Sequence, residues 1–577
     1  NDMLNGKFIG VAEQANVLVL EQKFAVRSAK KVTLFATALG VYFAEVNGVR
    51  VGDGYLAPGW TSYNKTLQVQ EYDITPLVKE GENILSLTVG EGWYRGALTW
   101  ERKRDTYGKQ TAVCADLVAD GKRILSTDES WSARESFIRE SGIYDGETQD
   151  FTVDLKPLTP VAVAFDKKAL VPQMCEPVRT VERIPVKEVI RTPNGELVYD
   201  FGQNLAGVVE VKTPVGFDGT LVLRHAEILV NGNFYTDNLR SAKATDTFTC
   251  KGAHTLSAEF TFHGFRYLCV EGAELPKECF TALVRHTDMR RTGHIQTDNA
   301  RFQRLYENVI WGQKGNFVDI PTDCPQRDER LGWTGDINAF CCTAAYNYDI
   351  RAFMKKWLKT LRDDQTADGR IPHVAPNCLA ERATDAMWCD AITMTPWTLY
   401  EMYGDISFLE ENFSAMEKFI SAREATMENG LIVRGHEYGD WLAMDGEALL
   451  GNGVIGRTDV YFLTNVLHVH SLKIAADAAH LLGREKEEKI YREKYERHLA
   501  RVREEYFTVR GRLAFDTVTA QTVALHFGII PEEYRAKLAT ILNENVVRHG
   551  YRMMTGFIGS PFLLFALADN GYFETAR

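Results

Sequence analysis

Long apolar runs are missing from this chain. None reaches the ~20 residues that a helix needs to cross a bilayer. Long basic runs are missing as well, and the net charge at pH 7 is −12. A protein that binds nucleic acid needs a basic stripe to neutralise phosphates. We therefore expect neither a membrane span nor a nucleic-acid partner.

The cysteines lack the spacing of a zinc site or of a disulfide framework. There are ten of them, and no CxxC pair occurs. Most stand among apolar neighbours, so we expect buried thiols, no metal and no other cofactor. The first residues, NDMLNGKFIG, also lack the basic and then apolar pattern of a targeting signal, and the compartment stays open.

The length of 577 residues predicts several domains, and the first two are rich in predicted strands. Residues 1–160 alternate short segments such as 32–37 and 41–48 with turn residues, which is typical of a β-sandwich. Asn47-Gly48 is a strong hairpin signal. Residues 161–290 predict a second β-sandwich, in which residues 258–272 read as two strands.

Residues 291–577 have helical periodicity. The segment 297–317 opens with Asp298 as a candidate cap. Later helical segments alternate with long polar loops at 318–336, 366–390 and 435–458. Long loops inside a compact domain are usually functional. This alternation favours a helical toroid with loops at one end.

One of these loops carries an unusual density of chemical groups. The run DCPQRDERLGWTGD contains Asp323, Arg327, Asp328, Glu329, Arg330, Trp333 and Asp336. Glycoside hydrolysis needs one carboxyl group to protonate the leaving oxygen and a second carboxylate to activate water or to attack the sugar. Asp and Arg also suit the hydroxyl groups of a sugar. An internal ion-pair network is the alternative interpretation.

This run resembles the signature of the α-L-rhamnosidases of glycoside hydrolase family 78. Further stretches resemble the family in the same order along the chain: NGVRVGDGYLAPGWTSYNK, DFGQNLAGVVEV, NLRSAKATDTF, FTFHGFRY, WCDAITMTPWTLYEMYGD and YGDWLA. The resemblance implies β-sandwich domains followed by an (α/α)6 barrel that removes terminal α-L-rhamnose with inversion. It implies that Glu329 is the general acid, and it implies a rhamnose pocket lined by Asp323, Arg327, Trp333, Asp336, Trp388 and Trp441. His373, in the loop 366–390, is a further candidate for that pocket.

The family pattern is incomplete in this chain. The resemblance implies that the general base is a Glu beyond residue 577, and the chain has fewer predicted helices than six helical pairs need. We therefore expect the barrel, at residues 291–577, to be truncated at its C-terminus. Glu437, Asp440 and Asp445 are other candidate pocket carboxylates.

Two further residues have candidate roles. Some family members have an N-terminal sandwich that binds rhamnose through calcium, and Asp53 is the candidate ligand by position. Calcium needs six or more oxygen ligands, so we expect a structural sandwich instead. Asp390, two residues after Trp388, is a candidate brace for its loop.

The leading hypothesis is an inverting α-L-rhamnosidase that acts on rhamnose-containing glycosides or polysaccharides. A non-catalytic carbohydrate-binding homologue is the first alternative. The second is an (α/α)6 glycosidase or lyase that acts on another sugar. The sequence leaves open whether the chain forms a homodimer.

Overall fold

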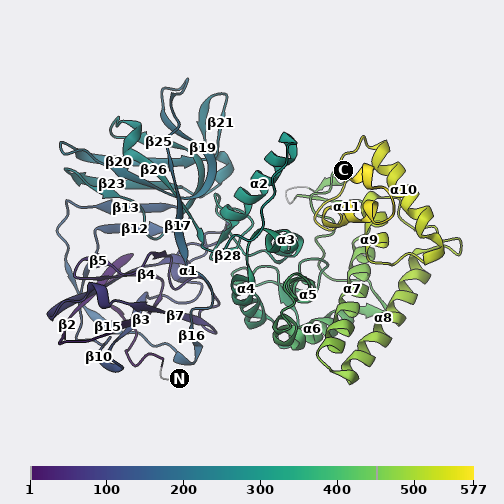
Figure 1. The fold of residues 1–577 in the computed structure, drawn as a ribbon, viewed down its shortest axis with the longest axis horizontal. Helices are drawn as coiled ribbons and strands as arrows, with labels where there is room; N and C mark the ends of the chain where they lie inside the picture. Colours follow the sequence, from purple (N-terminus) through teal and green to yellow (C-terminus); the bar gives the residue numbers. More distant parts are fainter. Residues whose placement is uncertain (1–2, 450–452) are drawn as a thin grey trace. The chain divides into compact units, whose positions relative to one another are not determined.

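A computed structural model describes residues 3–449 and 453–577. The chain forms two compact units, each described here by itself. Residues 1–331 and 352–357 form the N-terminal unit, and residues 332–351 and 358–577 form the helical unit. Figure 1 shows that the first is mainly strands and the second mainly helices. Within the described ranges, no helix combines the length and hydropathy that crossing a bilayer requires.

The N-terminal unit begins with two sheets that pack face to face. The first has the order β15 (Pro160–Ala162), β1 (Ile9–Val11), β9 (Ala112–Ala119), β3 (Val32–Leu39), β7 (Leu67–Asp73) and β16 (Leu170–Pro172), with β10 (Lys122–Ser126) on β9. The second has the order β14 (Pro157–Leu158), β11 (Ser132–Glu135), β2 (Val17–Val26), β8 (Gly81–Gly90), β4 (Val41–Val46) and β5 (Val49–Arg50). Leu20, Leu34 and Leu87 are buried in one hydrophobic cluster between them. This is the sandwich that the alternating pattern predicts.

The predicted hairpin at Asn47-Gly48 is confirmed. These two residues join β4 to β5, and their φ angles are 52° and 77°. Both angles are positive, which Asn and Gly tolerate better than other residues.

A larger sheet follows in the same unit. Its order is β12 (Ile138–Gly142), β13 (Gly146–Asp150), β23 (Thr245–Lys251), β20 (Asp218–Ala226), β25 (His263–Glu271), β19 (Leu197–Lys212), β26 (Phe280–Thr287), β17 (Val178–Pro185) and β6 (Gly54–Tyr55), with β18 (Glu188–Arg191) and β24 (Thr255–Leu256) on β19. Strands β12 and β13 precede β14–β16 in the chain, yet they pair in this sheet. The chain therefore leaves the first sandwich to form two strands of the large sheet and then returns to the sandwich.

The prediction of two strands in residues 258–272 is wrong. Only His263–Glu271 form a strand, β25. The backbone N–H groups of Glu259 and Phe260 bind the carboxylate of Glu147 instead of a neighbouring strand. Backbone N–H groups that are buried need a hydrogen-bond partner. Here that partner is a buried carboxylate and not the carbonyl groups of a neighbouring strand.

Helix α2 (Ala300–Asn316) closes the N-terminal unit and lies against β19. Its cap is Asn299 and not Asp298, because the Asn299 side chain accepts hydrogen bonds from the N–H groups of Arg301 and Phe302. Asn and Asp are comparably good caps, so the sequence alone could not separate the two neighbours.

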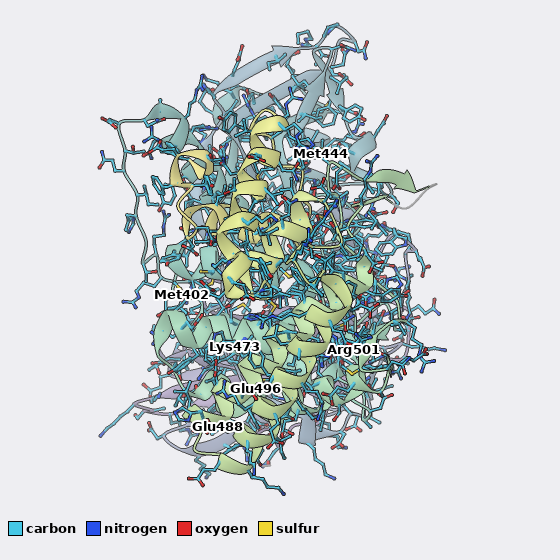
Figure 2. All side chains as sticks on the ribbon, turned by 90° about the vertical axis from the view of Figure 1, so that its right-hand side faces the viewer. Met402, Met444, Lys473, Glu488, Glu496 and Arg501 are labelled. Atoms are coloured by element: carbon cyan, nitrogen blue, oxygen red, sulfur yellow. The ribbon has the colours of Figure 1, made fainter. Side chains whose placement is uncertain are left out.

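The helical unit consists of successive helices with long loops between them. They are α3 (Thr334–Asn347), α4 (Arg351–Asp364, of which residues 352–357 belong to the N-terminal unit), α5 (Ala391–Tyr403), α6 (Ser407–Glu424), α7 (Val460–Leu481), α8 (Glu485–Tyr506), α9 (Val518–His526), α10 (Arg535–Arg548), α11 (Ser560–Ala568) and α12 (Phe573–Ala576). Neighbours in the chain pack together: α5 on α6, α7 on α8, and α9 on both α10 and α11. Figure 2 shows charged side chains, including Lys473 on α7 and Glu496 on α8, on the face turned toward the viewer.

The cysteines agree with the prediction of buried thiols in most cases. All ten are free, and seven of them are buried. Cys342, on α3, is an exception because it is exposed.

A buried ion pair ties α5, α6 and α7 together. Asp390, at the start of α5, binds both terminal nitrogens of Arg423 on α6, at 2.7 and 3.0 Å. It also accepts hydrogen bonds from the Ser471 hydroxyl and from the backbone N–H of Met387. Both charged side chains are inaccessible to solvent. Asp390 therefore braces the loop that precedes α5, as the sequence suggests.

Arg423→Met is expected to destabilise the helical unit strongly. The substitution leaves the buried carboxylate of Asp390 without its counter-ion, which typically costs about 3–5 kcal/mol. Chemical denaturation followed by circular dichroism measures the change. Arg434→Met is the matched control, because Arg434 pairs with Glu428 on the surface, and it should cost less than about 1 kcal/mol. Equal effects of the two variants would refute this account.

Candidate active site

The candidate acid, Glu329, lies in the loop between β28 (Ile320–Pro321) and α3, in the part that belongs to the N-terminal unit. Its side chain is largely buried. Oε2 accepts a hydrogen bond from the guanidinium of Arg240 at 2.9 Å, and a nitrogen of Arg327 lies 3.1 Å from the same oxygen. Two cations from different segments thus hold one carboxylate oxygen.

Two neighbouring carboxylates share these cations. Arg240 also donates to Asp328 at 2.6 Å through Nε, and the hydroxyl of Ser241 binds the other Asp328 oxygen. Arg327 lies 3.3 Å from Asp323. The structure therefore brings Asp323, Arg327 and Glu329 together, as predicted. These three side chains form part of an ion-pair network, which is what the alternative interpretation of this loop, a purely structural network, also predicts.

Arg240 contacts the candidate acid directly, and sequence reasoning missed it. It follows the short helix η3 (Asp237–Leu239) and has φ 55° and ψ −117°, an unusual backbone conformation for a residue with a side chain. Its segment resembles the family, but no local pattern singles it out. Its role depends on a contact with a carboxylate 89 residues later in the chain.

The buried side chain of Arg330 anchors the loop that carries Glu329. Its side chain is 1% exposed, and it donates to the carbonyl oxygens of Gln326 and Arg327 in the loop. It also donates to the carbonyls of Ile143 and Phe262 in the β-rich part. Burial lowers its pKa to about 10. The loop is therefore bound to the rest of the unit by a buried cation that donates to four backbone carbonyls.

A second anchor acts on the backbone of Glu329 itself. The hydroxyl of Tyr144 donates to the Glu329 carbonyl at 2.7 Å and is buried. The same hydroxyl accepts a hydrogen bond from the backbone N–H of Thr99. Tyr144 thereby fixes the peptide next to the candidate acid.

Asp323 has a strongly altered environment. Burial raises its pKa to about 6, and the charge of Glu329 acts in the same direction. The N–H of Leu331, at 2.9 Å, and Arg327 oppose the rise.

The predicted pocket residues of the helical unit surround one tyrosine. The ring centroid of Tyr438 lies 4.7 Å from Trp388, 5.9 Å from Trp441 and 6.3 Å from Trp333. It lies 5.0 Å from His373. The structure therefore brings these four predicted residues together around a fifth, Tyr438. Tyr438 belongs to the motif YGDWLA, but nothing in the sequence distinguishes it from other tyrosines.

His373 is held within this cluster by two further contacts. Its Nε2 lies 2.8 Å from the buried carboxylate of Asp385, and its backbone carbonyl accepts from the N–H of Thr334. Burial lowers the pKa of His373, but Asp385 and Glu381 outweigh burial, and the net shift is upward. Asp336 is half-buried in the first turn of α3, where a negative charge favours the helix dipole.

The other candidate carboxylates have different roles. Asp440 is fully buried and accepts hydrogen bonds from the backbone N–H groups of Gly556, Ile558 and Gly559. Its interpretation as a pocket carboxylate was wrong, because its acceptor capacity is used on the backbone. Glu437 is half-buried and accepts from the N–H of Ala386, and burial together with Asp385 raises its pKa to about 8. Asp445 accepts from the backbone of Arg457.

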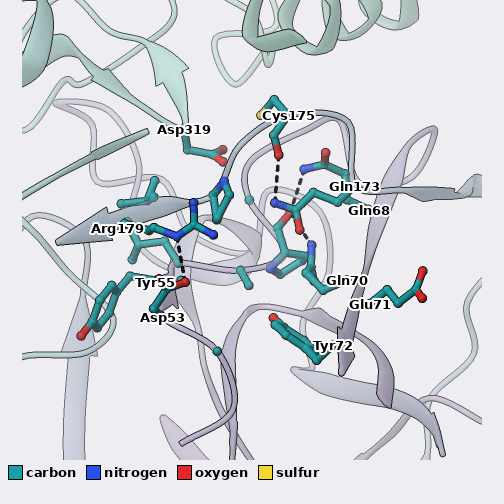
Figure 3. A pocket seen from close by; sticks show the side chains of 18 of the residues that line it. Asp53, Tyr55, Gln68, Gln70, Glu71, Tyr72, Gln173, Cys175, Arg179 and Asp319 are labelled. Carbon is teal, nitrogen blue, oxygen red and sulfur yellow. Dashed lines mark hydrogen bonds and ion pairs between the residues drawn. The ribbon is translucent and has the colours of Figure 1, made fainter. Parts of the chain in front are cut away.

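The Asp53 position does not suit calcium. Asp53 lies at a pocket of about 470 Å³ in the N-terminal unit (Figure 3). The Nε of Arg179 lies 2.8 Å from the Asp53 carboxylate. A guanidinium at this distance occupies the position that a cation would need, and calcium requires six or more oxygen ligands.

A buried group of possible metal ligands lies in the large sheet. His225, Asp246 and His263 are inaccessible to solvent, and His263 lies 3.0 Å from Asp246. Burial and the neighbouring His263 lower the pKa of His225 to about 3. The hydrogen bonds His263–Asp246 and His225–Ala244 account for one nitrogen of each ring.

Comparison with known proteins places this chain in a class of glycosidases. The model of the bacterial α-L-rhamnosidase six-hairpin glycosidase domain matches residues 290–577. Models of the α-L-rhamnosidase N-terminal domain and of the bacterial α-L-rhamnosidase concanavalin-like domain match residues 27–182 and 190–310. The helical unit therefore has the fold that its loop pattern predicts.

Individual relatives specify the family. An α-L-rhamnosidase of Streptomyces avermitilis is 36% identical over 99% of this chain and 56% of its own length. The crystal structure of an Aspergillus terreus α-L-rhamnosidase has a TM-score of 0.95 at 33% identity, covering all of this chain and 70% of that one. The S. avermitilis enzyme complexed with L-rhamnose has a TM-score of 0.91 at 34% identity, covering 99% of this chain and 56% of that one.

The chain belongs to the bacterial α-L-rhamnosidase family. It spans 56–63% of the length of the curated relatives that it matches.

The buried Asp323 gives a prediction for stability against pH. Its pKa in the folded state, about 6, lies above the ordinary value of 3.8. The folded state therefore binds this proton more tightly, and the stabilisation that the proton gives is lost as pH rises from 3.8 to about 6. The unfolding free energy of the wild type, relative to Asp323→Asn, should fall across this window and level off above it.

Urea denaturation at a series of pH values measures this difference, and Asp154→Asn, at an exposed position, supplies the reference profile. A difference that rises with pH would show that the ionised form of Asp323 is the one the fold prefers.

Proposed function

We propose that this chain belongs to an α-L-rhamnosidase that hydrolyses terminal α-L-rhamnose from glycosides with inversion, with Glu329 as general acid. The observation that supports this proposal is that contacts hold both the side chain and the backbone of Glu329 in place. One of its oxygens is held by Arg240 and Arg327, and its backbone is held by Tyr144, in a chain of this family. A general acid must meet the leaving oxygen within hydrogen-bonding reach, so a fixed carboxyl group is what the reaction needs.

The chemistry divides between two carboxyl groups. Glu329 would donate its proton to the glycosidic oxygen as the bond to the anomeric carbon breaks. In an inverting enzyme a second carboxylate removes a proton from the water that attacks the opposite face of the sugar. No carboxylate among the described residues is assigned to that second role.

The remaining predicted residues would bind the sugar. Asp323 and Arg327 carry the acceptor and donor groups that suit vicinal hydroxyls. Within the helical unit, the rings of Trp388, Trp441 and Tyr438 offer an apolar wall for the methyl group of a 6-deoxy sugar. Substrates of this kind are rhamnose-containing glycosides or polysaccharides.

The stereochemistry of the first product tests the reaction type. The complete protein should release L-rhamnose from an aryl α-L-rhamnoside. The first product should be the β anomer, because one displacement inverts the anomeric centre. Proton NMR within the first minutes of hydrolysis distinguishes it from the α anomer. Initial α-rhamnose would exclude inversion, and the absence of turnover would favour a carbohydrate-binding homologue.

Glu329→Gln tests the acid. Loss of a general acid should lower kcat by about 100-fold to 10,000-fold for a poor leaving group such as an alkyl alcohol. For a dinitrophenyl rhamnoside the loss should be much smaller, because that leaving group departs without protonation. Equal losses for the two substrates would remove Glu329 from the acid role.

Arg240→Met tests whether Arg240 holds the side chain of Glu329 in position for catalysis. Arg240 contributes charge-assisted hydrogen bonds to Asp328 and Glu329, and losing such bonds should lower kcat by about tenfold while KM changes little. Arg224→Met is the matched control, since Arg224 forms an exposed ion pair with Glu271. An effect confined to KM would mean that Arg240 serves substrate binding instead.

A further inference from the structure

A second pocket lies in the N-terminal unit, between α2 and the large sheet. Its walls are the bulge of β19 between Asp200 and Leu205, the start of β21 (Ile228–Val230) and one face of α2. Figure 1 shows α2 beside this sheet, and the two elements are in contact. The volume of about 460 Å³ falls within the size range of small-molecule sites.

The floor of this pocket is a fixed carboxylate. Glu227 accepts hydrogen bonds from the side-chain amides of Asn204, at 3.1 Å, and Gln326, at 2.9 Å. Asn316 also lines the pocket.

The wall formed by α2 combines an indole with an amide. Trp311 is half-buried, and Asn308 is exposed one turn earlier on the same helix face. Lys314 Nζ lies over the indole, 4.0 Å from the ring centroid, and the indole also packs against the core of the large sheet, so its remaining edge is what the pocket presents. An indole beside amides and a carboxylate matches a sugar, which presents an apolar C–H surface and several hydroxyl groups.

A glycine in α2 keeps this wall open. Glycine within a helix costs about 1 kcal/mol relative to alanine. A Cβ at Gly312 would meet no atom within 4 Å, so packing within the chain does not require glycine there. Gly312 therefore leaves the helix backbone uncovered where it lines the pocket.

The charges at the pocket favour an uncharged ligand. Arg266 is neutralised by a bidentate ion pair with Asp200, at 2.8 Å for both bonds. Arg304 pairs with Glu307. The cations are thus already compensated, and the Glu227 carboxylate at the floor opposes a second anion.

We propose that this pocket is a subsite for a neutral sugar unit of the substrate. The inference rests on the proposed function, because it takes the occupant to be part of the glycoside whose rhamnose is removed. Gln326 connects the pocket to the candidate acid: its amide binds Glu227, and it stands three residues before Glu329.

Fluorine NMR of protein labelled with 5-fluorotryptophan tests the pocket directly. Trp311→Phe identifies the signal of Trp311. D-glucose, D-galactose, L-rhamnose and D-glucuronate are then titrated separately. At least one neutral sugar should move the Trp311 signal saturably, with a dissociation constant in the millimolar range, while the signal of the buried Trp60 stays fixed. No movement with any neutral sugar, or tighter binding of glucuronate, would overturn the proposal.

A pair of glycine variants provides the control. Gly312→Leu adds a side chain to this wall, at a position where a Cβ would meet no atom within 4 Å, and it should raise the dissociation constant at least about tenfold. Gly216→Leu adds the same side chain in a loop where a Cβ likewise meets nothing within 4 Å, and it should leave binding unchanged. Binding that survives in Gly312→Leu would place the sugar elsewhere and refute the subsite.

This readout separates the two proposals, because binding needs no turnover. A protein that binds sugar at Trp311 but releases no rhamnose refutes the proposed function alone. A protein that releases rhamnose but shows no response at Trp311 refutes the subsite alone.

Discussion

The loop that carries Glu329 depends on one buried cation. Moving a guanidinium out of water costs several kcal/mol unless its donors are paired. Arg330 meets this condition with backbone carbonyls, two in its own loop and two in the β-rich part of the unit. The bonds that satisfy the charge therefore also fix the loop to the sheet. Arg330 has a φ of 51°, an unfavourable conformation that persists only where the surroundings enforce it.

The fixed loop gives its carboxylates different proton affinities. Burial opposes ionisation of Asp328, but the Ser241 hydroxyl and Arg240 outweigh it and hold the pKa of Asp328 below its ordinary value. Burial and the charge of Glu329 raise the pKa of Asp323 instead. Divergent environments for neighbouring carboxyl groups are how one site keeps some ionised and others protonated. In this loop the divergence comes from partners such as Arg240 and Ser241, which belong to distant segments.

Because these partners come from distant segments, the sequence could predict only part of the site. The run 323–336 was recognisable because its charged groups are consecutive, and the strand-rich and helical parts followed from periodicity. Arg240, Tyr144 and Tyr438 were missed because their roles exist only once distant segments meet. Asp440 was misread for the related reason that composition cannot distinguish a carboxylate that binds substrate from one that binds backbone amides. Residues 258–262 failed as a strand because a buried Glu147 accepts their hydrogen bonds.

Gln326 links the acid loop to the pocket on α2, and this link constrains how the pocket can work. Its carbonyl accepts from Arg330, and its side-chain amide donates to Glu227. A ligand that displaced Gln326 from Glu227 would therefore disturb a residue to which the Arg330 anchor is bound. The pocket can serve the reaction only if it is formed before the ligand arrives, with Glu227 already held by its amide partners. The bulge of β19 supplies one of those partners, Asn204, and on the facing wall a Cβ at Gly312 would meet no atom within 4 Å.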